Sequence, residues 1–161
     1  MPVTNLKLSY EPADFEDIPV IFALAKDLID TYEDTENIDY DKVIGWVLNK
    51  ITRNITDYQC IYADGMKAGY YRLSPENGST ELDDLYVLPE FRGRGIGTTV
   101  LNRCIEETPT PLFLYVFKRN VGAIKLYSRM GFSISEDLGN TRCIMRREVD
   151  RPTAQVYNRD I

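Results

Sequence analysis

The chain has 161 residues and a formal net charge of −6, and 43% of its residues are hydrophobic. This length suits one compact domain with its own core. The sequence contains no histidine, which excludes Ser-His-Asp triads, Cys-His nucleophile pairs and HExxH zinc sites. The three cysteines (Cys60, Cys104 and Cys143) are far apart, so they suggest small buried side chains rather than a disulfide framework or a metal site. We therefore expect no bound metal, and proton transfer must use Asp, Glu, Tyr, Lys or water.

Charge is unevenly distributed along the chain. Residues 1–91 hold 18 acidic and 7 basic side chains, whereas residues 92–147 hold 4 acidic and 10 basic ones. The negative net charge of the whole chain argues against non-specific nucleic-acid binding. The basic part suits a small polyanion such as a phosphate-bearing cofactor, and the acidic part suits a cationic partner. Ordinary solvated surface charge explains both parts equally well.

The sequence shows no signal for membrane insertion or secretion. No apolar run reaches the roughly 18 residues that a membrane span needs. The first residues lack the basic segment and apolar core of a secretion signal. We therefore expect a cytoplasmic protein without a membrane partner.

The first part of the chain predicts a strand and two helices. Residues 6–10 alternate in polarity, as a half-buried strand does. Asp14 is a candidate cap for a helix over about 15–32, and apolar spacing predicts a second helix over about 40–52. The segment 32–41 between these helices is rich in acids and has no base.

The middle of the chain has β character. Residues 58–63 and 67–74 flank the dipeptide Asp64-Gly65, a strong hairpin signal. A further turn at 75–78 leads to a strand over 81–88. Three consecutive strands joined by tight turns predict an antiparallel meander.

The remaining elements alternate between helix and strand. They are a Gly/Arg-rich loop over 89–97, a helix over 96–107, an apolar strand over 112–117, a helix over 121–130 that ends at Gly131, and two strands over 132–135 and 141–149. The run LFLYVF at 112–117 is typical of a strand buried on both faces. Together the elements predict one α+β domain with a mixed sheet.

The strongest local signal is Arg92-Gly93-Arg94-Gly95-Ile96-Gly97, which lies between a predicted strand and a predicted helix. Glycines let the backbone turn tightly and approach a ligand, and free N–H groups at a helix start attract anions. The two arginines add positive charge, so a pyrophosphate is the natural ligand. The spacing matches neither the Walker motif nor the dinucleotide-binding GxGxxG motif. A purely structural turn is the alternative.

Two motifs together carry a family resemblance. The segment from Val87 to Gly97 resembles V-x-P-x-[YF]-R-[GR]-x-G-[IL]-G, the acetyl-CoA-binding signature of the GNAT N-acetyltransferase superfamily. The segment from Asn120 to Phe132 resembles the family's second motif, N-x-x-A-x-x-[LF]-Y-x-x-x-G-F. Both motifs lie in the family's order, with a helix and a buried strand between them. The chain is therefore identified as a member of this superfamily.

The resemblance implies a fold and an activity. The expected fold is a GNAT-like mixed, mostly antiparallel sheet of about seven strands flanked by about four helices, in one domain over 1–161. Residues 1–56 would supply the acceptor-side helices, and residues 81–132 the acetyl-CoA-binding core. The expected reaction is direct transfer of an acetyl group from acetyl-CoA to a primary amine, which needs no protein nucleophile.

By resemblance, the cofactor is held by the glycine loop, the preceding strand and the second motif. The residues concerned are Leu85, Tyr86, Val87, Arg92, Gly93, Arg94, Gly95, Ile96, Gly97, Thr98, Asn120 and Tyr127. The strand would align the pantetheine arm like an added strand. Asn120 would bind the same arm, and it is also a candidate helix cap.

Tyr127 resembles the family's general acid, which protonates the departing thiolate, and a phenol with a pKa of about 10 keeps its proton at neutral pH and so has one to donate. Its alternative is a role in core packing. Glu81 matches the position of a glutamate base in some members, and Asp83 is the next candidate. Strand alternation places Glu81 and Asp83 on one face and Asp84 on the other. Water, or solvated charge without a catalytic role, remains an alternative for the base.

The two amino-terminal helices frame the acceptor pocket in this family. Here they flank an acidic stretch, so Glu33, Asp34 and Glu36 are candidate ligands for a cationic small-molecule amine. Tyr32 and Tyr40 would add cation–π contacts. A solvated acidic loop is the alternative. A protein or peptide acceptor and a non-catalytic acyl-CoA-binding module also stay open, as does a homodimer.

Overall fold

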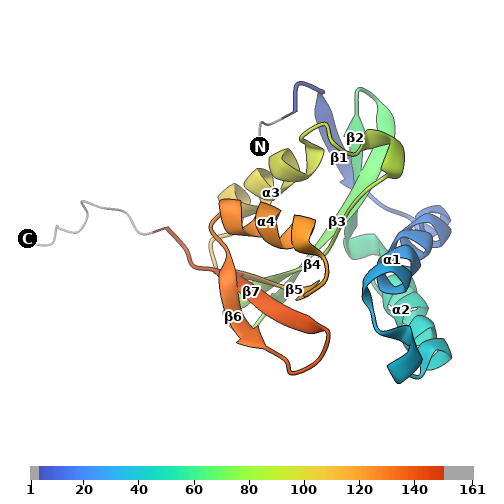
Figure 1. Cartoon of the computed structure of the whole chain (residues 1–161). Helices are drawn as coiled ribbons and strands as arrows, with labels where there is room; N and C mark the ends of the chain where they lie inside the picture. Colours follow the sequence, from blue (N-terminus) through green and yellow to red (C-terminus); the bar gives the residue numbers. More distant parts are fainter. Residues whose placement is uncertain (1–3, 151–161) are drawn as a thin grey trace, which may run out of the picture.

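A computed structural model of the chain describes residues 4–150, and the ends of the expected domain, 1–3 and 151–161, lie outside them. Within residues 4–150, seven strands form one sheet in the order β1-β2-β3-β4-β5-β7-β6, accompanied by four α-helices (Figure 1). The strands are β1 (Leu8–Pro12), β2 (Tyr58–Ala63), β3 (Met66–Glu76), β4 (Ser79–Val87), β5 (Leu112–Phe117), β6 (Ser133–Asp137) and β7 (Arg142–Arg147). The helices are α1 (Ile18–Tyr32), α2 (Tyr40–Arg53), α3 (Ile96–Glu107) and α4 (Val121–Arg129). The predicted α+β class with a mixed, mostly antiparallel sheet is confirmed.

The predicted meander is confirmed, since β2, β3 and β4 pair in sequence and antiparallel. The parallel pairing in the sheet joins β4 to β5 and is short: Thr80 lies opposite Leu112, and Glu81 opposite Phe113. β5 then pairs with β7 along its whole length. The two strands β4 and β5 therefore separate beyond Glu81, and the sheet opens there.

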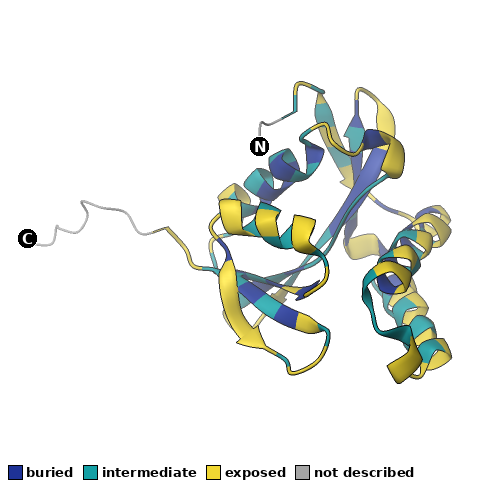
Figure 2. Cartoon of the chain, in the orientation of Figure 1, coloured by how far each residue is buried: buried dark blue, intermediate teal, exposed yellow. Residues whose placement is uncertain are grey.

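Helices cover both faces of the sheet, and each face has its own core. Successive residues of β3 point to opposite sides, as strand geometry requires. Tyr70 packs with Ile21 of α1 and Ile51 of α2, whereas Tyr71 belongs to the cluster that contains Leu101 of α3. Figure 1 shows α1 and α2 together, away from α3 and α4, and Figure 2 shows that the outward sides of α1 and α2 are exposed.

The start of α1 is fixed to the sheet by polar contacts. Asp14 caps the short turn before α1, as predicted, with its side chain accepting a hydrogen bond from the Glu16 backbone. Asp17 is only 4% exposed, and its carboxylate accepts hydrogen bonds from Lys67 Nζ and Tyr70 Oη, each 2.8 Å long. A buried carboxylate needs such partners, so these contacts hold α1 against β3.

Among residues 4–150, no helix combines the length and apolar character that a membrane span requires.

The prediction that β5 is buried on both faces is wrong for part of the strand. Leu112, Leu114 and Val116 are buried, but Phe113 is half-buried and Tyr115 is 44% exposed. Tyr115 lines the cavity that opens where β4 leaves β5. An apolar side chain at this place borders an open cavity instead of a closed core.

Candidate active site

A glycine-rich turn joins β4 to α3. Gly93 and Gly95 have φ angles of 78° and 81°, a left-handed conformation that glycine adopts without strain. Gly95 stands at the N-cap of α3, and Thr99 N donates to its carbonyl over 3.1 Å. In the part of the chain that the structure describes, no group accepts a hydrogen bond from the backbone N–H groups of residues 93–98. These donors and the helix dipole form a site suited to an anion.

Side chains around this turn also suit a phosphate-bearing ligand. Thr98 is 4% exposed, and its hydroxyl has no hydrogen-bond partner among the described residues. A buried hydroxyl without a partner is unfavourable, so a ligand oxygen would satisfy it. Arg92 Nε donates to the Val87 carbonyl over 2.9 Å, and the Arg94 guanidinium lies 5.4 Å from the Phe91 ring centre. Neither arginine forms an ion pair with an acid in 4–150.

The edge of β4 next to the turn is open on one side. Leu85, Tyr86 and Val87 pair with β3, but the pairing of β4 with β5 ends at Glu81. A bulge precedes these residues, because Arg72 lies opposite Asp84 and the next residue of β3 lies opposite Leu82, which leaves Asp83 unpaired. Bulges bend a strand and end pairing. The exposed backbone can accept an extended ligand as an added strand.

The separation of β4 from β5 opens into a cavity of about 450 Å³. Helices α1 and α2, strands β4, β5 and β7, and helix α4 with its cap contribute to its wall. The lining residues are Ala25, Leu28, Ile29, Glu33, Val43, Trp46, Val47, Lys50, Glu81–Tyr86, Leu114–Phe117, Asn120, Ala123, Tyr127 and Arg142. The cavity thus joins the predicted base Glu81, the predicted acid Tyr127 and part of the predicted cofactor site.

Glu81 lines this cavity just before the strands separate. Burial raises the pKa of its carboxyl to about 7, and the nearby Asp83 carboxylate adds to this rise while Lys50 opposes it. Within residues 4–150, no basic side chain forms an ion pair with Glu81. Its carboxyl can therefore gain and lose a proton near neutral pH.

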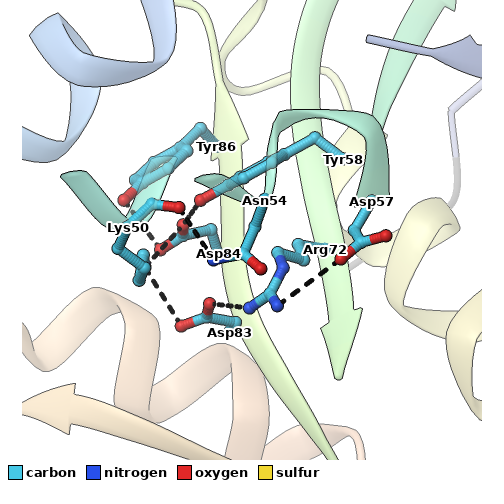
Figure 3. Close-up of polar contacts among 8 residues, drawn as sticks. All are labelled: Lys50, Asn54, Asp57, Tyr58, Arg72, Asp83, Asp84 and Tyr86. Carbon is cyan, nitrogen blue, oxygen red and sulfur yellow. Dashed lines mark hydrogen bonds and ion pairs between the residues drawn. The ribbon is translucent and has the colours of Figure 1, made fainter. Parts of the chain in front are cut away.

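Asp83 and Asp84 both form an ion pair with Lys50. The prediction that these two side chains lie on opposite faces of β4 is therefore wrong. Lys50 of α2 lies 3.2 Å from Asp83 Oδ1 and 3.1 Å from Asp84 Oδ2 (Figure 3). Tyr58 Oη donates to Asp84 Oδ2 over 2.6 Å, and Tyr86 Oη donates to Asp84 Oδ1 over 2.9 Å. The bulge at Asp83 interrupts the alternation from which the opposite faces were predicted.

The other oxygen of Asp83 is bound by Arg72 of β3, which also lies 3.8 Å from Asp57 (Figure 3). Burial raises the pKa of the Asp84 carboxyl, and the Lys50 ammonium opposes that rise. Burial alone would lower the pKa of Lys50, but Asp84 and Asp83 outweigh it and raise that pKa. Lys50 therefore stays charged and ties α2 to β4.

Asn120 caps the start of α4, and Tyr127 lies near its end. Burial raises the pKa of the Tyr127 phenol to about 12. Its ring centre lies 5.7 Å from that of Phe132, and no described group forms a hydrogen bond with its hydroxyl. Asn120 accepts a hydrogen bond from Ala123 N over 3.2 Å, so its predicted capping role is confirmed. Both side chains line the cavity.

The acidic stretch is divided between the cavity and local contacts. Glu33 lines the cavity and accepts hydrogen bonds from Thr141 and from the Asp34 backbone. Asp34 bonds to Asn37 over 2.6 Å, and neither Asp34 nor Glu36 is among the cavity's lining residues. The structure thus brings one of the three predicted acceptor ligands to the cavity.

A sequence model of the acetyltransferase (GNAT) family matches residues 21–132, more than half of the chain. The chain belongs to the GNAT acetyltransferase family. Membership confirms the predicted enzyme class, an N-acetyltransferase with acetyl-CoA as its donor.

Known GNAT proteins resemble the chain in sequence and in fold. An uncharacterized N-acetyltransferase of Methanocaldococcus jannaschii is 42% identical over 60 residues, which are 35% of this chain and only 26% of that relative. Spermine/spermidine N(1)-acetyltransferase of Bacillus subtilis is 29% identical over 103 residues, 55% of this chain and 68% of that protein. The PaiA N-acetyltransferase of Thermoplasma acidophilum, solved in complex with coenzyme A, shares the fold with a TM-score of 0.65. It is 20% identical, over 89% of this chain and 99% of that one.

Several residues at or beside the cavity of this GNAT protein were not identified from the sequence. Lys50, which lines the cavity, and Arg72, which does not, were missed because nothing in their sequence context shows that they meet on Asp83. Trp46 and Arg142 line the cavity from α2 and β7, and neither belongs to a family motif. The one sequence signal for this part of the site was that the chain's single tryptophan, Trp46, lies in a predicted acceptor-side helix.

Proposed function

We propose that this GNAT protein transfers an acetyl group from acetyl-CoA directly to a primary amine of a cationic small molecule. The charge of the cavity carries the proposal, because four acidic side chains line it against two basic ones, Lys50 and Arg142. A volume of about 450 Å³ suits a small molecule. The similarity to spermine/spermidine N(1)-acetyltransferase, which by its name acts on polyamines, supports the same acceptor class.

The glycine turn and the open edge of β4 would hold the coenzyme. The N–H groups of residues 93–98 would bind the diphosphate, with added positive charge from Arg92 and Arg94. The backbone of residues 85–87 would pair with the pantetheine arm, and the Asn120 amide would bind the same arm. The residues present fit the group, since these N–H donors have no acceptor within 4–150. The bound coenzyme would supply an activated thioester.

Glu81 is the base in this proposal. An amine must lose its proton before it can attack, and a base with a pKa close to the working pH does this best. The pKa of the Glu81 carboxyl is about 7. Asp83, the other predicted candidate, has both carboxylate oxygens in ion pairs, with Lys50 and with Arg72. These contacts favour Glu81 over Asp83.

Tyr127 is the acid in this proposal. A pKa of about 12 means that its hydroxyl keeps its proton at neutral pH. A thiol has a pKa of about 8.5, below that of the Tyr127 phenol. Proton transfer from the Tyr127 hydroxyl to a departing thiolate is therefore favourable only where that thiolate is poorly solvated. The half-buried position of Tyr127 on the cavity wall provides such surroundings.

Contacts at the end of α1 disfavour a long peptide acceptor. The rings of Tyr32 and Phe117 stack with their centres 6.4 Å apart, and Glu33 hydrogen-bonds Thr141 in the β6–β7 connection. These contacts join α1 to β5 and to the β6–β7 hairpin beside Glu33 and Phe117, which line the cavity, and so they restrict the room for a long acceptor there. An extended peptide would need an open groove here.

An acetylation assay with a panel of acceptors tests the proposal. The panel contains polyamines, aminoglycosides, basic and acidic amino acids and a peptide, and the readout is the release of free coenzyme A. We expect polyamines and other cationic amines to be the best acceptors and Tyr127→Phe to lower kcat by about 100-fold. Acetylation of acidic amines or the peptide alone would contradict the proposed acceptor. Wild-type rates in Tyr127→Phe would contradict its role as the acid.

A further inference from the structure

We propose that Trp46 determines acceptor specificity by binding a second ammonium group of the acceptor at the mouth of the cavity. Linear polyamines would then be better acceptors than monoamines of the same length. This inference rests on the proposed function, since it assigns a role within the same cavity. It adds a recognition element that neither family motif contains.

The position of Trp46 is the first argument. Trp46 lies on α2 and lines the cavity together with Val47 and with Val43 and Lys50, which are its neighbours three residues before and four residues after it on the helix surface. Yet 62% of its surface is exposed to solvent. A large aromatic side chain buried in a core would not keep this exposure. The indole therefore stands where the cavity meets bulk water.

An internal cation already shows what the indole face can bind. Lys42, one helical turn earlier, places its Nζ atom 5.3 Å from the centre of the Trp46 ring. This distance is within the range of a cation–π interaction, and tryptophan is the best aromatic partner for an ammonium ion. Lys42 is exposed, so it can move aside without leaving a buried charge unpaired. A ligand ammonium would take the same place or the opposite face of the ring.

Two groups of the cavity lining, Glu81 and Trp46, then serve two different amines. The reacting amine must lose its proton, and Glu81 is placed to accept it. A second amine of the same molecule stays protonated and needs a partner that tolerates its charge. The Trp46 face does so without imposing one hydrogen-bond direction, so it accommodates diamines of several lengths. A monoamine gains nothing from it.

Steady-state kinetics with matched acceptors test this role. Each linear diamine is compared with the monoamine that has the same number of carbons, and the readout is the ratio of their kcat/KM values. We expect Trp46→Leu to lower the ratio about tenfold, and Trp46→Phe to keep most of it. Leu48→Ala is the control, because Leu48 is an exposed apolar residue of α2 outside the cavity lining. An unchanged ratio in Trp46→Leu, or equal losses in the Leu and Phe variants, would overturn the inference.

A second variant and a spectroscopic readout make the test independent of folding defects. Lys42→Met removes the competing ammonium, so we expect the KM for diamines to fall about twofold. Trp46 is the chain's single tryptophan, so its fluorescence reports directly on this site. Spermine should change the emission of the wild type, and the matched monoamine should not.

The outcomes separate the two proposals. A wild type that acetylates no amine refutes the proposed function before any variant is made, and the inference with it. A wild type that acetylates spermine without a change in tryptophan emission refutes the role of Trp46 alone.

Discussion

At the scale of single residues, Glu81 differs from the neighbouring acids Asp83 and Asp84 in having no cationic partner among the described residues. With a pKa of about 7, its carboxyl is protonated below neutral pH and ionised above it. The rate of the wild type should therefore rise with pH through about 7. We expect Glu81→Gln to lower kcat/KM by about 100-fold and to remove this limb of the pH profile. A variant with an unchanged profile would assign the base elsewhere.

The same substitution should change stability in a pH-dependent way. The folded-state pKa of about 7 lies above the ordinary glutamate value, so between the two the folded protein keeps a proton that the unfolded chain loses. The free energy of unfolding therefore falls as pH rises through this window and levels off above about 7. Glu81→Gln has no carboxyl at this position, so its free energy of unfolding does not show this fall.

Denaturant unfolding at several pH values measures this difference. We expect the advantage of Glu81→Gln over the wild type to grow from acidic pH to pH about 8. Glu136→Gln, in the exposed strand β6 and outside the cavity lining, is the matched control for the loss of one surface carboxylate. A constant difference between Glu81→Gln and the wild type would contradict the raised pKa.

Residue-level prediction was most specific where a motif fixes both the residue type and its place, as it does for Asn120 and Tyr127. Glu81, Asn120 and Tyr127 line one cavity, and their catalytic and binding roles stay predictions. Lys50 and Arg72 could not be found in this way, because their meeting at Asp83 depends on a strand bulge and on how α2 packs. Tertiary contacts of this kind leave no local pattern in a single sequence.

At the scale of elements, two glycines in regular structure should respond to alanine in opposite ways. Gly45 lies inside α2, and an added Cβ would meet nothing within 4 Å. Gly45→Ala should therefore raise the free energy of unfolding by about 1 kcal/mol through helix propensity. Gly69 of β3 lies against β4, where an added Cβ would come within 2.0 Å of the Tyr86 carbonyl oxygen. Gly69→Ala should therefore lower the free energy of unfolding by about 3 kcal/mol.

Thermal unfolding of both variants checks the close packing of β3 on β4. We expect Gly45→Ala to raise Tm by about 2–4 °C and Gly69→Ala to lower it by more than that. Because residues 85–87 of β4 are also the proposed pantetheine edge, Gly69→Ala should weaken coenzyme binding as well. A Gly69→Ala protein as stable as the wild type would contradict the close approach of these strands.

The order and type of the elements followed from periodicity and turn residues, and α3 and β5 have the predicted bounds. Two features of the sheet could not be predicted from periodicity and turn residues. The exposure of Tyr115 and the meeting of Asp83 with Asp84 both result from the way β4 bends and leaves β5. Strand alternation assumes regular pairing, so it fails where a bulge or a gap in the sheet interrupts that pairing.

At the scale of the whole molecule, the two oppositely charged parts of the chain meet at one place. The acidic first part contributes Glu33 and Glu81 to the cavity, and the basic second part contributes Arg142 to it and also holds the glycine turn, which follows the cavity-lining strand β4. This arrangement agrees with an anionic cofactor on one side and a cationic acceptor on the other. The sequence showed the asymmetry, but only the sheet topology places both parts around the separation of β4 from β5.

The central claim is that the N–H groups of residues 93–98 bind the diphosphate of the coenzyme. Calorimetric titration of the protein with coenzyme A, and separately with pantetheine, tests it most directly, since pantetheine lacks the diphosphate. We expect coenzyme A to bind at least about 100-fold more tightly, as loss of several charge-assisted hydrogen bonds implies. Equal affinities for the two ligands, or no heat with coenzyme A at millimolar concentration, would contradict the account.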